Sequence, residues 1–484
     1  MSVSGSNSIS NKLNTRALPI RRGLSLPVFK LLASFAIMAQ ALLFACVRPM
    51  VDYSQMAAAS VLQLIFLIAV LGFSPRRQSF CILFLVADWV FYCGQFACIA
   101  VGQYGSLNLD FRLYVSPSVA ERAFSFYFYA QSLISFGVVL FQGTCAKTGS
   151  KRSVISITRN VSLALIAVGT PFRVYIDTMR LIGAFSSGYE GVYSLAIPSI
   201  YQAAAFFFDS GLLMLLLLYG KREKGPILFW GILVYKIVAM STGARQEAFC
   251  FVVVWCFLYF CYVNRLSACR LAALFLGGIV LLYAIDAFGE LRGQGFSFSS
   301  FQSYLSGRSP LDVVWDSLGE FGCAFTTLAV AVDRVPSLLD YGMGRSYLAG
   351  LLSVVPSLVG HFPALKASTV FTTSLPGTSY FGGSMLGELY YNFGWYGLAG
   401  SFLVGGIVSA CQNGLNNLEL ERVGSKAWLA AVISVFMLLY IRGYFTDAIM
   451  KLVYTLLLAW IATGFDRQVH KRTTEKSSIM RNLI

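Results

Sequence analysis

Residues 228–263 read "LFWGILVYKIVAMSTGARQEAFCFVVVWCFLYFCYV" and contain two apolar runs separated by a short polar link. Each run approaches the roughly 20 apolar residues that a helix needs to cross a bilayer. The link holds Arg245, Gln246 and Glu247 and is long enough only for a tight hairpin. The stretch therefore predicts two membrane-spanning helices with charged residues placed where they meet.

The whole chain has the character of this stretch. Of its 484 residues, 57% are hydrophobic and only 12% are charged, and the mean hydropathy is +0.68. Such a composition cannot supply the charged coat of a soluble protein of this length, so it indicates an all-α polytopic membrane protein. In a membrane protein the formal net charge of +15 reports topology, and we expect no nucleic acid as a partner.

Cysteine and histidine usage argues against metal and disulfide chemistry. The eleven cysteines lie mostly in apolar runs and form no CxxC pair, and the chain has only two histidines. This pattern is typical of neither a disulfide framework nor a zinc site. We therefore expect no metal and no cofactor.

Hydropathy predicts about twelve spans and a simple domain order. The predicted spans are 28–47, 57–73, 79–101, 123–141, 153–171, 197–218, 226–240, 247–263, 271–287, 390–410, 427–442 and 448–463. They divide the chain into a cytosolic arm (1–27), spans one to nine (28–287), a long outer segment (288–389), spans ten to twelve (390–463) and a cytosolic tail (464–484).

The distribution of Lys and Arg sets the orientation of these spans. With the N-terminus in the cytosol, the inner segments hold 23 Lys and Arg and five Asp and Glu, whereas the outer segments hold twelve and fifteen. Basic residues are retained on the cytosolic side of membrane proteins, so both termini are expected there. The link around Arg245 then lies on the outer side, where basic residues are the minority.

The long outer segment contains three distinct stretches. Residues 308–336 are predicted as one amphipathic helix, since Ser309 is a suitable N-cap and Pro310 a suitable first residue. Residues 342–366 are apolar but interrupted by Gly and Pro, so we expect them to lie at the interface or to re-enter the membrane. Residues 372–400 are dense in aromatic side chains, which anchor at interfaces or pack against sugar rings.

Four motifs within residues 236–400 resemble one known family. The motifs are "STGARQEAF" (241–249), "SLGEFG" (317–322), "GRSYLAGLLSVVP" (344–356) and "GELYYNFGWYGLAG" (387–400). Together with the twelve-span layout, they resemble bacterial O-antigen polymerases of the Wzy type, which are integral membrane glycosyltransferases.

The resemblance implies a fold, a reaction and partners. The fold is a membrane glycosyltransferase-like helical bundle, shared with O-antigen ligases. The reaction moves a growing glycan from undecaprenyl pyrophosphate onto the next lipid-linked repeat unit, at the periplasmic face of the inner membrane and without a metal. The partners are an undecaprenyl-pyrophosphate-linked oligosaccharide donor and acceptor, membrane lipid and, in addition, a chain-length regulator protein.

That reaction directs attention to arginines on the outer side. A pyrophosphate leaving group needs fixed positive charge, and the guanidinium fork matches phosphate oxygens. Arg245 is the first candidate because the family's Gly-x-Arg pattern matches it; the alternative is an ordinary loop charge paired with Glu247. Arg442, at the outer end of the eleventh span, is the second, with snorkelling to the interface as its alternative. Further candidates are Arg292, Arg345 and Arg173.

The acceptor hydroxyl needs a general base. Glu388 is the first candidate, because it precedes the tenth span at the place where related ligases carry a His-containing motif. His361 is the second, as the one histidine on the outer side. Tyr380 and Tyr391 are the expected sugar-contacting aromatics.

Charges inside the predicted spans are compatible with more than one function. Asp209 and Lys236 are expected to pair within the membrane, and Asp88 to join them, since unpaired charges in lipid are costly. A proton relay would be a transporter's use of the same residues. The alternatives to a polymerase are an O-antigen ligase-like transferase, a flippase or transporter of lipid-linked sugars, and a scaffold without enzymatic activity.

Overall fold

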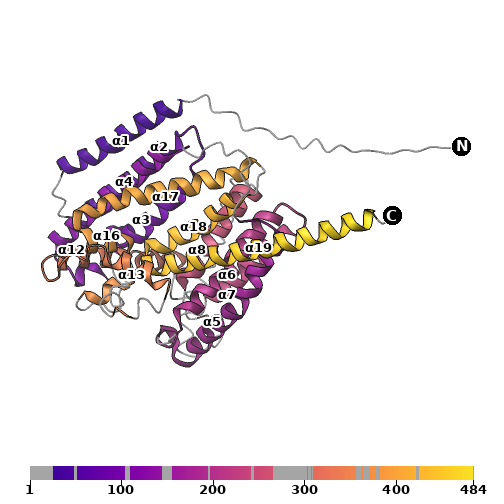
Figure 1. The fold of residues 1–484 in the computed structure, drawn as a ribbon. Coiled ribbons are helices and arrows are strands. Elements are labelled where there is room, and N and C mark those ends of the chain that lie inside the picture. The colour runs from indigo at the N-terminus through magenta and orange to yellow at the C-terminus, as the bar shows by residue number, and fades with distance from the viewer. Residues whose placement is uncertain are drawn as a thin grey trace.

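The computed structural model is a bundle of packed helices (Figure 1). Every regular element in the described part of the chain is helical, and nine helices there are long and apolar enough to cross a membrane. The protein is therefore a polytopic integral membrane protein. The structure describes residues 25–47, 52–103, 110–143, 155–193, 197–240, 245–264, 302, 307, 309–355, 361–362, 370–375, 382–420 and 424–482.

The first half of the chain supplies eight α-helices at the positions of the first eight predicted spans. They are α1 (Leu26–Val47), α2 (Tyr53–Gly72), α3 (Ser79–Ala100), α4 (Pro117–Phe141), α5 (Arg159–Tyr193), α6 (Ser199–Tyr219), α7 (Gly225–Met240) and α8 (Arg245–Leu258). A π-helical turn, η2 (Tyr259–Val263), continues α8. The predicted ninth span, 271–287, lies outside the described residues.

The second half supplies three short helices and the last three spans. They are α11 (Pro310–Phe321), α12 (Ala324–Arg334), α13 (Arg345–Ser353), α16 (Met385–Phe393), α17 (Leu398–Asn416), α18 (Ser425–Ile441) and α19 (Phe445–Asn482). The tenth predicted span is built from α16 and α17, which a 3-10 turn (Gly394–Gly397) joins. α18 matches the eleventh span, and α19 extends well beyond the predicted twelfth.

The prediction of one helix over 308–336 is wrong, although its start is confirmed. Ser309 caps α11 as expected, because its side chain accepts a hydrogen bond from the backbone N–H of Asp312. The helix then breaks at Gly322, where a Cβ would lie 2.5 Å from the backbone nitrogen of Gln95 in α3. Backbone packs directly on backbone at this contact, and the chain turns so that α12 enters the protein interior, where almost its whole length is buried.

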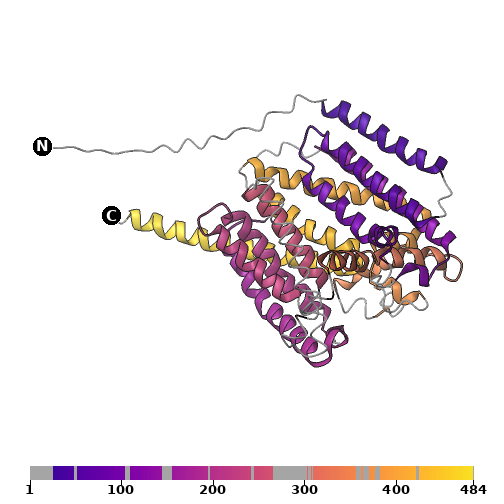
Figure 2. The same cartoon turned by 180° about the vertical axis from the view of Figure 1, so that it is seen from behind.

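The helices form two groups with a layer of helices between them. In front and rear views, α5, α6 and α7 form one group and α1, α2 and α4 another (Figures 1 and 2). Between them run α3, α8, α18 and α19, and α19 packs against α5, α6, α13 and α18. One end of this middle layer holds the candidate site described below.

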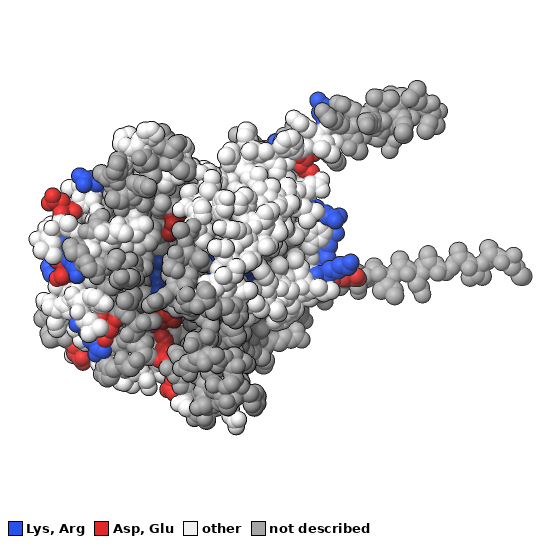
Figure 3. All heavy atoms as spheres, turned by 90° about the horizontal axis from the view of Figure 1, so that it is seen from below, with Lys and Arg blue, Asp and Glu red and all other residues white. Residues whose placement is uncertain are grey.

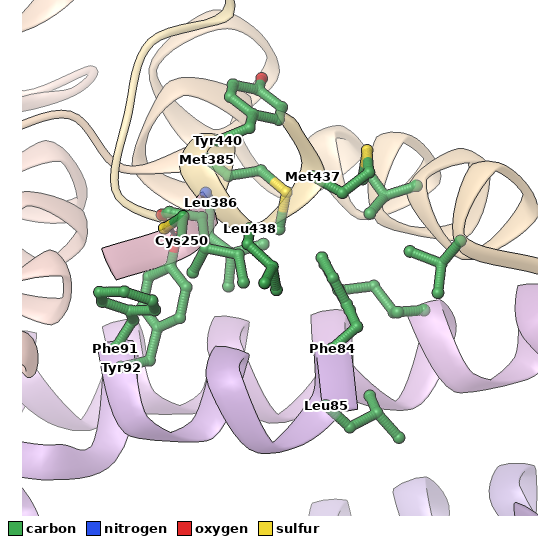
Figure 4. Close-up of a cluster of buried hydrophobic side chains, with 14 of the residues drawn as sticks. Phe84, Leu85, Phe91, Tyr92, Cys250, Met385, Leu386, Met437, Leu438 and Tyr440 are labelled. Atoms are coloured by element: carbon green, nitrogen blue, oxygen red, sulfur yellow. Dashed lines mark hydrogen bonds between the residues drawn. The ribbon is translucent and has the colours of Figure 1, made fainter. Parts of the chain in front are cut away.

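One buried tyrosine fixes two elements of that site. Tyr92 rises from α3 beside Leu386 and Cys250 (Figure 4). Its hydroxyl accepts a hydrogen bond from the backbone N–H of Leu386 (2.9 Å) and donates to the carbonyl of Ile441 (3.1 Å). The start of α16 and the end of α18 are therefore held at one point of the interior.

The charges inside the spans form a buried ion-pair cluster. Lys236 of α7 pairs with Asp209 of α6, as predicted. Arg173 of α5 joins them, with guanidinium nitrogens 3.0 Å from Asp177 and 3.8 Å from Asp209. We call Arg173, Asp177, Asp209 and Lys236 the sealed cluster. Asp88 takes no part in it: its carboxylate accepts a hydrogen bond from Gln131 on α4 (3.3 Å), so the expectation for Asp88 is wrong.

Candidate active site

A cavity of about 260 Å³ opens where α5, α8, α18 and α19 meet. Two acidic and three basic side chains line it, and they come from four separate segments. They are Arg180, Glu247, Arg442, Asp447 and Lys451. We call these five residues the cavity cluster.

A tight hairpin between α18 and α19 brings three of them to the cavity. α18 ends at Ile441, Arg442 caps it, and α19 begins at Phe445. The hairpin fits only because glycines meet there: a Cβ on Gly383 would lie 2.4 Å from the carbonyl carbon of Gly443. Asp447 and Lys451 follow one turn apart on α19, so both line the cavity with Arg442.

The start of α8, with Gln246 and Glu247, forms another side of the cavity. Gln246, in the first turn of α8, donates hydrogen bonds to the carbonyls of Arg442 (3.0 Å) and Leu439 (3.3 Å). The N-terminal ends of α8 and α19 are thereby held beside each other at the cavity. Helix N-termini carry partial positive charge, which favours an anionic ligand.

Glu247 is the charge that connects the helices around the cavity. Its carboxylate oxygens lie 3.5 Å from the Lys451 ammonium and 3.8 Å from the Arg180 guanidinium. The Glu247 side chain is 15% exposed, and those of Arg180 and Lys451 are 15% and 10% exposed. All three are therefore shielded from bulk solvent and still reachable from the cavity.

Tyr444 adds a hydroxyl to the cavity wall. Its oxygen lies 2.6 Å from the Thr372 hydroxyl. Burial raises the pKa of Tyr444 to about 12, so the phenol stays protonated at neutral pH. It can therefore donate a hydrogen bond to a ligand oxygen and does not serve as a base.

Glu388, the first candidate for the base, lies beneath the cavity and not in its wall. Its side chain is fully buried. One carboxylate oxygen accepts a hydrogen bond from the Ser346 hydroxyl (2.6 Å) and the other from the backbone N–H of Phe445 (3.0 Å). Asn392 also donates to Ser346. Glu388 thus connects α13, α16 and the start of α19.

The other predicted side chains lie at several places. Arg173 belongs to the sealed cluster and does not line the cavity. Arg345, the first residue of α13, and His361 are exposed, and neither lines the cavity. Tyr391 is buried and stacks on Phe371, with ring centroids 5.4 Å apart.

Three predicted residues cannot be assigned side-chain positions. Arg292 and Tyr380 lie outside the described residues. Arg245 is the first residue of α8, next to the cavity-lining Gln246, but its side chain is outside the described part. Among the predicted arginines whose side chains the structure describes, Arg442 lines the cavity, and Arg173 and Arg345 do not.

Three members of the cavity cluster were not singled out from the sequence. The sequence presents Glu247 only as a partner for Arg245, and Arg180 and Lys451 lie in none of the four motifs that resemble the family. A signal for Lys451 exists, since it follows Asp447 by one helical turn at the outer end of an otherwise apolar span. In the described part of the chain, no three His, Cys, Asp or Glu side chains come together as a metal site would require.

Comparison with known proteins gives one match. The model of the family "O-antigen polysaccharide polymerase Wzy" matches residues 28–465, which includes every span described above. No curated protein and no solved structure is significantly similar to the chain. The family resemblance of the motifs is confirmed, and membership implies a polymerase of the glycosyltransferase type. Because the match covers nearly the whole chain, the protein belongs to the O-antigen polysaccharide polymerase Wzy family.

Proposed function

We propose that the cavity is the active site at which O-antigen is extended from a lipid pyrophosphate donor. In this reaction a hydroxyl oxygen of the acceptor repeat unit bonds to the anomeric carbon of the growing glycan. The bond from that carbon to the pyrophosphate oxygen breaks, and undecaprenyl pyrophosphate leaves with the electron pair. The observation that carries the proposal is the convergence of Arg180, Arg442 and Lys451 on one cavity in a membrane protein of this family.

The charges of the cavity suit a pyrophosphate leaving group. Negative charge grows on the leaving oxygens as the bond breaks, and prearranged cations stabilise that charge most effectively where water is scarce. Three cations against two carboxylates leave the cavity cluster net positive, and the N-terminal ends of α8 and α19 add to this. In our proposal these groups take the place of a metal ion, and Arg245 at the start of α8 is a further donor to the pyrophosphate.

Asp447 is the proposed general base. It lines the cavity beside Arg442, whereas both oxygens of Glu388 are occupied beneath the cavity. A base must come within hydrogen-bond reach of the proton that it accepts, and in our proposal an acceptor hydroxyl in the cavity would lie beside the cavity-lining Asp447. We assign Glu388 a positioning role, in which it holds the start of α19 and hence Asp447.

The charge distribution supports a periplasmic cavity and cytosolic termini. In the space-filling view, mostly Lys and Arg gather at one end, both signs occur at the opposite end, and a broad uncharged band lies between (Figure 3). The short connections far from the cavity carry Arg76, Arg77, Lys221, Arg222 and Lys224. Basic connections remain in the cytosol, so the cavity end would face the periplasm of the inner membrane.

A complementation experiment tests the function. Cells that lack the protein should display surface lipid capped with a single repeat unit, and the wild-type chain should restore a ladder of long glycans. An Arg442→Gln variant should restore insertion into the membrane but not the ladder. A matched Arg112→Gln variant, outside the cavity, should restore both. Uncapped lipid with accumulated lipid-linked polymer would indicate a ligase, and intermediates held at the cytosolic face would indicate a flippase; either result contradicts the proposal.

Metal independence has its own test. Purified protein should extend lipid-linked repeat units at an unchanged rate after exhaustive EDTA treatment. A loss of activity that Mg²⁺ or Mn²⁺ restores would contradict this part of the proposal.

A further inference from the structure

Glu247 raises a question that the proposed function leaves open. A cavity built to bind pyrophosphate contains a carboxylate that would repel it. This carboxylate is shielded, and it lies between two of the three cavity cations, Lys451 (3.5 Å) and Arg180 (3.8 Å). A residue that only opposed binding would have no use there.

We propose that Glu247 is an internal counter-anion that promotes release of the leaving pyrophosphate. In the empty site it faces Arg180 and Lys451, and in the loaded site phosphate oxygens take those cations from it. After transfer, Glu247 reclaims the cations and lowers the affinity for the product. This inference rests on the proposed function, because it assumes that pyrophosphate occupies the cavity.

The distances between Glu247 and its two cations fit such an exchange. A charge-assisted hydrogen bond between an ammonium or guanidinium nitrogen and a carboxylate oxygen measures about 2.7–2.9 Å. Both Glu247 contacts are longer, so the cations are held near the carboxylate without being locked to it. In the sealed cluster, Arg173 donates a hydrogen bond to Asp177 at 3.0 Å, besides its 3.8 Å contact with Asp209.

The helix turn that carries Glu247 is held in place, whereas its partners lie at the ends of long side chains. It lies in the first turn of α8, and the neighbouring Gln246 is hydrogen-bonded to two carbonyls at the end of α18. Arg180 and Lys451 reach it from other helices on long side chains with many rotamers. The cations can therefore turn toward a ligand and return to a carboxylate whose helix is held in place.

The consequence is that removal of the Glu247 charge should tighten product binding. A carboxylate within several ångströms of a phosphate raises the free energy of the bound state by Coulomb repulsion, and its loss should lower the Kd about tenfold at an intermediate effective dielectric. If Glu247 only held Arg180 and Lys451 in place, its loss would instead let them separate and would weaken binding. The two roles thus predict opposite signs.

The test is calorimetric titration of inorganic pyrophosphate into the full-length protein in lipid nanodiscs. We expect Glu247→Gln to bind about tenfold more tightly than the wild type, by the same Coulomb argument. Glu247→Asp keeps the charge but draws it back, so we expect a smaller tightening, and this variant reports the sign if the Gln variant fails to fold. The matched control is Asp110→Asn, which removes a carboxylate from an ion pair outside the cavity and should leave the Kd unchanged.

A second measurement is the steady-state kinetics of polymerisation. With lipid-linked substrate, Glu247→Gln should show a lower kcat, an unchanged or lower KM, and stronger inhibition by added pyrophosphate. A folded Glu247 variant that binds pyrophosphate as the wild type does, or more weakly, overturns the counter-anion role and leaves the proposed function standing. Absence of binding in every protein, the wild type included, overturns the pocket assignment and this inference with it.

Discussion

Arg173 and Arg180 of α5 belong to two different charge clusters, the sealed cluster and the cavity cluster. Arg173 and Arg180 are seven residues apart, and therefore on one face of the helix, and each meets carboxylates from neighbouring helices. Arg173 lies in the sealed cluster with its side chain 3% exposed, 3.8 Å from Asp209 of α6 and 3.0 Å from a second carboxylate, Asp177 of α5 itself. Arg180 lies in the cavity cluster with its side chain 15% exposed and its carboxylate at 3.8 Å.

This difference in exposure distinguishes charges that stabilise the fold from charges that a ligand in the cavity can contact. In the sealed cluster, the charges neutralise one another inside the membrane, where an unpaired charge would be costly. In the cavity cluster, the pairing is loose and the cations exceed the carboxylates. Loss of a charge should thus reduce stability in the first cluster and activity in the second.

The largest effect that this comparison predicts is on the rate of transfer at Asp447. Asp447→Asn removes the proposed base, and general-base catalysis contributes about 10²–10⁴-fold to rates, so we expect kcat to fall by that factor. Thermal unfolding of the variant should match the wild type, because Asp447 belongs to the loosely paired cluster. Single-turnover extension of lipid-linked repeat units measures the rate. A rate within threefold of the wild type, roughly 0.7 kcal/mol, would remove Asp447 from the mechanism.

The sharpest test of the comparison replaces each of the two arginines of α5 by Gln in turn. Arg173→Gln removes the cation of Asp177 and leaves Asp209 with Lys236 alone, and breaking a buried pair costs about 3–5 kcal/mol of folding free energy. Arg180→Gln should keep the stability of the wild type but slow polymerisation by about 10²-fold, as for the loss of one charge-stabilising donor. Unfolding in detergent and polymer formation are measured for both variants. If both variants lose stability, or if both keep stability and lose only polymer formation, the distinction between the sealed and cavity clusters is wrong.

Much of the fold follows from the sequence, and the exceptions have physical causes. Hydropathy finds spans one to eight because each one is a long local signal, and the cap at Ser309 is local as well. The break at Gly322 is not local, since it depends on contact with Gln95 of α3, more than two hundred residues away. Local patterns report what a segment can form, and packing against distant segments decides where it stops.

The site is harder to predict from the sequence for the same reason. Arg442 and the link around Glu247 are visible as charges at span ends on the side that disfavours basic residues. The choice between Arg173 and Arg180 is not visible, because α6 and α7 supply the carboxylate and lysine that surround Arg173. Glu388 stands out as a candidate base in its motif, but only the structure shows that its two carboxylate oxygens accept hydrogen bonds from α13 and α19.

A moderate effect is expected at Glu388, which separates positioning from catalysis. Glu388→Gln keeps the size of the side chain but leaves one of its two donors facing an amide NH₂ group, and such a buried mismatch costs about 1–3 kcal/mol of folding free energy. Stability and activity should fall together, unlike in Asp447→Asn. Glu388→Asp, which retains the charge, should not restore the wild-type rate, since its shorter side chain cannot span Ser346 and Phe445. An inactive Glu388→Gln protein with wild-type stability would instead make Glu388 the base.

The smallest effect is expected at an ion pair that is shorter than those of the cavity cluster but lies at the surface. Arg112 and Asp110 are 2.6 Å apart, closer than any pair in the cavity cluster, yet the Arg112 side chain is 29% exposed. Water and salt screen such a pair, and exposed pairs contribute about 0–1 kcal/mol, so Arg112→Gln should change the unfolding free energy by no more than that. Unfolding at low and high salt measures it, and polymer length should stay unchanged. A larger loss would mean that distance, and not burial and surplus charge, ranks the ion pairs of this protein, and the distinction between the sealed and cavity clusters would then fail.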